Sequence, residues 1–150
     1  MRDTGIPRKE TTMTYRKTLL AAMFPLLLVG CSTLKNINIG GEFEKSSRSY
    51  LQLVRWQEFE SAAVTYVSPP LQEAYRERIK AAGEVKVADY RVKMMECDPV
   101  KGEATVKVEL DYYRPPSTRV RTIEDLQKWS YEGENGQRIW RLKSLLPEFR

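Results

Sequence analysis

The stretch Ala104-Thr105-Val106-Lys107-Val108-Glu109-Leu110-Asp111-Tyr112 gives the clearest indication of the fold of this chain. Apolar residues occupy its even positions, and three charged residues stand between them. Side chains of a β-strand point alternately to opposite faces, so this pattern places an apolar face against a core and a polar face in water. One wet face is typical of an antiparallel sheet that is covered on one side.

The period of two continues through most of the chain after Gly83, and turn-forming residues interrupt it three times. The third stretch has apolar residues at both odd and even positions, which indicates a bulge or a less regular strand. Short connections between consecutive strands predict an antiparallel meander. The predicted strands are Glu84 to Cys97, Ala104 to Tyr112, Thr118 to Glu132 and Arg138 to Leu145.

Two helices are expected before the sheet. The first covers Ser46 to Val67, where apolar residues recur at helical spacing. Ser68 is expected to cap the second helix, with Pro69 in its first turn and Gly83 at its end. The apolar face of the first helix is expected to contain Leu53, Trp56, Phe59, Ala63, Tyr66 and Val67. Together with the meander, this order predicts an α+β fold, with two N-terminal helices packed on a curved four-stranded antiparallel sheet.

This pattern over roughly residues 46–146 resembles the cystatin-like α+β roll, particularly the NTF2-like superfamily. The segment Trp129-Ser130-Tyr131-Glu132, followed by Gly136 and Trp140, is similar to the hairpin that closes many such domains. The chain departs from the fuller plan because it has no evident helix between the early strands, which argues against the deep conical pocket of the superfamily. The aromatic residues either pack the core or line a pocket. The candidate pocket-lining residues are Trp56, Tyr66, Tyr90, Tyr112, Trp129 and Tyr131.

The superfamily contains isomerases and dehydratases as well as non-catalytic binding and assembly domains, so the fold alone does not assign a function. The resemblance implies that an enzyme of this kind would use an acidic general base in its pocket, often beside a His or Tyr. This chain has no His, and its candidates are Asp89, Asp111, Tyr90, Tyr112 and Tyr113. No nucleophile elbow, phosphate loop or metal-ligand spacing is present in the sequence. We therefore expect no catalytic residues, no metal and no cofactor.

Leu28-Val29-Gly30-Cys31, at the end of an apolar stretch from Thr18, is similar to the lipobox of bacterial lipoproteins. Tyr15-Arg16-Lys17 supplies the positive flank of a signal peptide. The resemblance implies cleavage after Gly30 and a diacylglycerol thioether with further acylation, such as palmitate, on Cys31. An ordinary core helix that ends in a Cys is the alternative interpretation.

We accordingly expect a signal peptide over residues 1–30 with translation starting at Met13, a lipidated flexible linker over 31–45, and an α+β domain over 46–150. Ser32 in place of Asp resembles the lipoproteins that are transferred to the outer membrane. The expected location is thus the bacterial cell envelope, in the outer membrane facing the periplasm.

The chain contains 25 Lys+Arg and 20 Asp+Glu, of which residues 1–30 hold five and two. The remaining 20 and 18 nearly balance, so the sequence predicts no nucleic-acid partner. Arg114, Arg119 and Arg121 are expected to lie on a solvated edge or face. Once Cys31 carries lipid, Cys97 has no cysteine partner and is expected to be a half-buried thiol.

The sequence thus favours a lipid-anchored domain that binds or scaffolds an envelope protein or a small hydrophobic ligand. Two alternatives remain open. One is an NTF2-like enzyme with an isolated Asp of raised pKa in a cavity. The other is a structural homodimer that associates through the outer face of the sheet.

Overall fold

The computed structural model describes residues 30–133 and 137–150, and their side chains from residue 38 onward. Residues 36–150 form one compact unit. The helices are α2 (Gly30–Arg55), α3 (Phe59–Tyr66), the short 3-10 helix η2 (Pro69–Leu71) and α4 (Gln72–Ala82). The strands are β1 (Lys86–Asp98), β2 (Glu103–Tyr113), β3 (Arg121–Glu132) and β4 (Ile139–Leu142).

The four strands form one antiparallel sheet in the order β1-β2-β3-β4. This confirms the predicted meander, and β2 has the predicted alternation of buried and half-buried residues. The irregularities lie in β1, where the register with β2 shifts between Val87 and Asp89 and between Val92 and Met94. The pairing of β3 with β2 runs without a shift from Arg121 to Ser130, so the bulge predicted for the third strand was wrong.

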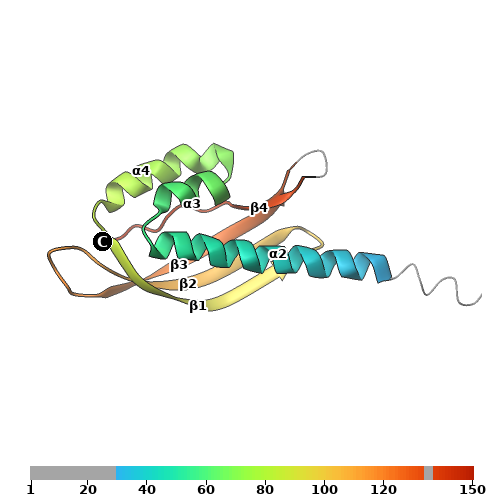
Figure 1. Cartoon of the computed structure of the whole chain (residues 1–150), viewed down its shortest axis with the longest axis horizontal. Coiled ribbons are helices and arrows are strands. Elements are labelled where there is room, and N and C mark those ends of the chain that lie inside the picture. The colour runs from blue at the N-terminus through green and yellow to red at the C-terminus, as the bar shows by residue number, and fades with distance from the viewer. Residues whose placement is uncertain (1–29, 134–136) are drawn as a thin grey trace, which may run out of the picture. The chain divides into compact units, whose positions relative to one another are not determined.

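The predicted α+β class is confirmed: three α-helices pack on the open four-stranded sheet, and Figure 1 shows α2 running along it. The prediction of only two helices was wrong. The segment that was expected to form one helix from Ser46 to Val67 belongs to two helices, α2 and α3.

Helix α2 begins well before Ser46. Its buried residues from position 39 to position 54 recur at intervals of one helical turn, and they are Ile39, Phe43, Ser47, Tyr50, Leu51 and Val54. The flexible linker expected up to residue 45 was therefore wrong from Ile39 onward. The polar composition and the Gly40-Gly41 pair suggested a linker, but packing of one apolar face stabilises a helix even where local propensity is poor.

The chain turns at Trp56 to Glu58, between α2 and α3. Gln57 has a positive φ of 59°, which ends the α-helical path, and its side-chain amide donates to the backbone oxygens of Arg55 and Val87. Trp56 is expected on the buried face of a single long helix, whereas it is 70% exposed. Because of this turn, Trp56 does not share the helical face of α3 that places Phe59, Ala62 and Ala63 in the core.

Gly83 ends α4 with a φ of 60°, as its position in the sequence predicts. The expected capping role of Ser68 was wrong, because its side chain makes no capping hydrogen bond. The buried Ser68 hydroxyl instead lies 3.1 Å from both Glu132 Oε2 and Lys143 Nζ. Lys143 Nζ also lies 2.6 Å from Glu132 Oε1. These three side chains connect the start of η2 to the β3–β4 region.

Charged residues dominate the outer face of the sheet, which is the surface that a homodimer of the expected kind would use. Arg91 of β1 pairs across the strands with Glu109 at 3.1 Å and with Asp111 at 2.5 Å, and Lys107 pairs with Glu124 at 2.9 Å. These partners already satisfy one another within a single chain. The homodimer stays a prediction.

Candidate functional site

Two consecutive inward positions of β3 carry buried polar residues, Asp125 and Gln127. The amide Nε2 of Gln127 donates to Asp125 Oδ2 at 2.8 Å, and the indole Nε1 of Trp129 lies 3.4 Å from Gln127 Oε1. A polar side chain inside a core costs free energy unless it is hydrogen-bonded, so each member of this row depends on its neighbour. The row lies within the core that the helices cover.

Two tyrosines from different helices meet in the same core. The hydroxyl oxygens of Tyr50 in α2 and Tyr75 in α4 lie 2.9 Å apart, and both side chains are buried. Burial raises the pKa of both phenols, and the negative charge of Asp125 raises both further. The pair is therefore neutral at physiological pH and acts as a hydrogen-bonded contact between α2 and α4.

Asp125 is 6% exposed, and burial raises the pKa of its carboxyl group to about 6. It lies at the edge of a surface hollow of about 550 Å³. The residues around the hollow are Tyr112, Thr122, Ile123, Glu124, Asp125, Pro147, Glu148 and Arg150. A carboxyl group with a pKa near neutrality is suited to exchange protons with a bound molecule, so Asp125 is the strongest candidate for acid–base chemistry among the described residues.

Sequence reasoning missed Asp125, although a signal was available. Asp125 shares the odd-numbered register of Trp129, and the structure places both side chains on the buried face of β3. Asp89 and Asp111, which the sequence suggested instead, are different in character. Asp89 is exposed and lies 3.8 Å from Arg55, whereas hydrogen bonds from Arg91 and Thr122 lower the pKa of Asp111 to about 2. A carboxylate held ionised in this way is a poor general base.

The aromatic residues mostly pack against one another. The ring centroid of Trp129 lies 6.0 Å from that of Phe43, 5.6 Å from that of Tyr50 and 6.2 Å from that of Tyr66. Edge-to-face contacts at these distances are typical of core packing. Tyr131 lies 5.3 Å from Trp140, with the guanidinium of Arg138 over its ring.

The six aromatic residues considered for a pocket therefore do not converge on one. Tyr66 and Trp129 meet in the core, Trp56 is exposed, and Tyr131 lies near the β3–β4 turn. Tyr112 is 3% exposed, and its hydroxyl lies 2.6 Å from the backbone oxygen of Arg150. Tyr90 is half-buried on β1, and Tyr113 is half-buried at the end of β2. Only Tyr112 borders the hollow beside Asp125.

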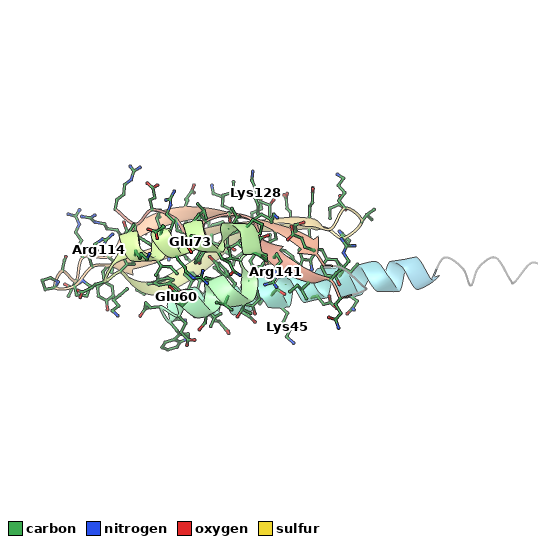
Figure 2. The ribbon with its side chains drawn as sticks, turned by 90° about the horizontal axis from the view of Figure 1, so that it is seen from above. Lys45, Glu60, Glu73, Arg114, Lys128 and Arg141 are labelled. Carbon is green, nitrogen blue, oxygen red and sulfur yellow. The ribbon has the colours of Figure 1, made fainter. Side chains whose placement is uncertain are left out.

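Arg114, Arg119 and Arg121 line one small surface hollow. Arg114, labelled in Figure 2, donates to the backbone oxygens of Ala82, the last residue of α4, at 2.7 Å and of Phe149 at 2.8 Å. Arg121 donates to the backbone oxygen of Arg150, and Arg119 is exposed. Two of the three guanidinium groups thus tie the C-terminal segment to the sheet.

Cys97 is half-buried in β1, as the sequence predicts, and burial raises the pKa of its thiol. A thiol of raised pKa carries little thiolate and is a weak nucleophile. Among the described side chains, those of residues 38–133 and 137–150, no three His, Cys, Asp or Glu are grouped so as to hold a metal ion.

Only two of the four lipobox-like residues lie in the part of the chain that the structure describes. Leu28 and Val29 lie outside the described residues, while Gly30 and Cys31 begin α2. None of the helices in the described part is sufficiently long and apolar to span a membrane.

No protein-family model matches the chain, and neither the curated proteins nor the solved structures contain a match to it.

Proposed function

We propose that this protein is a lipid-anchored lipoprotein of the bacterial cell envelope, whose α+β domain binds or scaffolds a partner without catalysis. The observation that carries the proposal is the sequence Leu28-Val29-Gly30-Cys31 after a positive flank and an apolar stretch. The Cys31 thiol would take diacylglycerol as a thioether, and the small Gly30 would let a signal peptidase reach the bond before Cys31. Several acyl chains on one residue give stable anchoring, because each buried methylene contributes about 0.8 kcal/mol.

The cystatin-like or NTF2-like roll is the finer form of the fold that we propose for the domain. The α+β order and the meander support it. A non-catalytic role is supported by the packing of Tyr66 and Trp129 against Tyr50, which uses their rings in the core. The partner would be an envelope protein or a small hydrophobic ligand.

The decisive experiment replaces Cys31 by Ser in the full chain, expressed in a Gram-negative bacterium. The expected result is an unprocessed precursor without acyl mass, whereas the parent chain is cleaved before Cys31, acylated and recovered with membranes. Intact mass and membrane fractionation measure both properties. Cys97→Ser is the matched control, since it removes the other thiol and should leave acylation unchanged. Equal processing of the parent chain and Cys31→Ser would refute the anchor.

One observation favours the enzymatic alternative: Asp125 combines deep burial, a raised pKa and a place beside a hollow. An NTF2-like isomerase or dehydratase would use such a carboxyl group as its general base. A thermal-shift screen of small carbonyl compounds tests this alternative. Stabilisation of the parent chain that disappears in Asp125→Asn would support it, and its absence across the screen would favour the binding proposal.

A further inference from the structure

The β1–β2 turn, Asp98 to Gly102, presents an apolar side chain to solvent from a well-fixed backbone. Val100 is 81% exposed at its tip. Asp98 Oδ1 accepts hydrogen bonds from the backbone nitrogens of Val100 and Lys101, both at 3.0 Å, and Gly102 N donates to Asp98 O at 2.9 Å. Lys101, next to Val100, is exposed, and its Nζ lies 3.4 Å from Asp98 Oδ2. An exposed apolar side chain beside a long amphipathic one suits the boundary between lipid and water.

Contacts within residues 36–150 place the first buried residue of α2 close to this turn. The indole Nε1 of Trp140 donates to the backbone oxygen of Ile39 at 3.0 Å. Trp140 packs on Tyr131 with ring centroids 5.3 Å apart, and Tyr131 N donates to Gly102 O at 2.8 Å. Trp140 and Tyr131 thus connect Ile39 with the β1–β2 turn.

The other end of α2 lies at the opposite end of the sheet. Gln57, directly after the helix, donates from its side chain to Val87 O at 3.3 Å, and Arg55 lies 3.8 Å from Asp89. Val87 pairs with Tyr112 near the end of β2, just before the β2–β3 connection. Figure 1 shows this connection and the β1–β2 turn at opposite ends of the strands.

The chain between Cys31 and Ile39 limits how far this domain extends from an anchored lipid. Eight residues span at most about 28 Å when fully extended and about 12 Å when helical. The 11 residues of β2 separate the two ends of the sheet, and at about 3.3 Å per residue they span roughly 36 Å. The tether is therefore shorter than the sheet, whichever path it takes.

We propose that the domain stands on the bilayer with the β1–β2 turn toward it and that Val100 contacts lipid. The proposal rests on the proposed lipid anchor at Cys31. The partner of this surface is a phospholipid bilayer. Two features favour it: the short tether at the Ile39 end, and the exposed Val100 and Lys101. The opposite end of the sheet then points away from the membrane.

The β2–β3 connection provides a matched comparison. Val120 is 53% exposed there and is followed by Arg121, so its local chemistry is similar to that of Val100 and Lys101. Val120 is less exposed than Val100 but lies between two arginines, Arg119 and Arg121, which favour an anionic lipid surface. Local charge alone therefore does not predict stronger lipid contact at Val100, whereas the position relative to the tether does.

The test uses the full chain with Cys97→Ser and either Val100→Cys or Val120→Cys. Each protein is processed in cells, purified in its lipidated form, labelled at the new thiol with an environment-sensitive fluorophore and reconstituted into phosphatidylcholine and phosphatidylglycerol vesicles. Intact mass confirms acylation, and circular dichroism confirms that both variants fold. Phospholipids with a spin label on the acyl chain should quench the probe at position 100 several-fold more than the probe at position 120.

The outcomes separate the two proposals. Acylated proteins with equal quenching at both positions, or stronger quenching at position 120, would overturn the proposed orientation and leave the lipid anchor standing. A parent chain without acyl mass and absent from membranes would remove the anchor, and the orientation with it.

Discussion

At the residue scale, Asp125 is the most unusual group in the described part of the chain. Its carboxyl group is buried and accepts a hydrogen bond from the side-chain amide of Gln127. Burial disfavours the charged form and so raises the pKa to about 6. This residue therefore links the stability of the fold to pH.

We expect Asp125→Asn to stabilise the protein near pH 7. The unfolded carboxyl has a pKa near 3.8 and the folded one about 6, so between these values the folded state binds more protons and its stability falls as pH rises. The cost of the buried charge at neutral pH is roughly 1 to 3 kcal/mol. Urea unfolding should show a gain for the variant at pH 7 that disappears near pH 4.

Asp111→Asn is the control for this prediction because its pKa is shifted the other way. The hydrogen bonds from Arg91 and Thr122 lower the pKa of Asp111, so its ionised form stabilises the folded state above about pH 4. That contribution is lost as pH falls toward 2. A gain that is the same at every pH for Asp125→Asn would contradict the assigned cause.

The Tyr50–Tyr75 pair yields a second prediction at this scale. Replacing either tyrosine by Phe leaves the other buried hydroxyl without its partner, at a cost of about 1 to 3 kcal/mol in the free energy of unfolding. The double variant should lose less than the sum of the two single losses, because no unpaired hydroxyl remains. A double-mutant cycle by denaturant unfolding measures this coupling. Additive losses would mean that the 2.9 Å contact contributes no coupling energy.

At the scale of the elements, α2 depends on the sheet for its stability. The α2 segment is polar on average and contains Gly40 and Gly41, so the helix propensity of its residues alone predicts little helix. The apolar side of α2 reaches Trp129 and Trp140 through Phe43, with ring centroids 6.0 Å and 4.9 Å apart. Packing of this kind determines where the helix forms in the chain.

We therefore expect Phe43→Ala to lower the free energy of unfolding by about 3 to 5 kcal/mol, because it opens a cavity between α2 and two tryptophans. Lys45→Ala, two residues further on at an exposed position, is the matched control and should change stability little. Circular dichroism during chemical unfolding measures both variants. Equal stability of the two would mean that the start of α2 is not part of the core.

At the scale of the whole molecule, the proposed lipid anchor and the direction of the strands determine which surfaces of the protein would face the bilayer. A lipid on Cys31 would fix one end of the domain close to the bilayer. The charged outer face of the sheet and the exposed Trp56 would then remain accessible to partners in the envelope.

Ser32→Asp tests the proposed final location. If the chain follows the sorting rule that its Cys31-Ser32 sequence resembles, the variant should remain in the inner membrane, whereas the parent chain reaches the outer membrane. Sucrose-gradient separation of the two membranes measures the distribution. Thr33→Asp is the neighbouring control, since it adds the same charge one position further from the lipidated residue. An unchanged distribution for Ser32→Asp would contradict outer-membrane sorting by residue 32.

The sequence by itself determined the four-stranded meander, the α+β class and the end of α4 at Gly83. These features follow from period-two alternation and from local turn chemistry, both of which are written in consecutive residues. The lipobox-like segment is equally local, and its interpretation comes from the sequence alone.

Only the tertiary structure decided the extent of α2, the turn at Gln57 and the exposure of Trp56. It also decided that Asp125, and not Asp89 or Asp111, is the carboxyl group of raised pKa. The physical reason is that burial and helix stability depend on residues distant in the chain. The Trp140 indole donates to the backbone oxygen of Ile39, 101 residues earlier, and the pKa of Asp125 is raised because its carboxyl group is buried away from water.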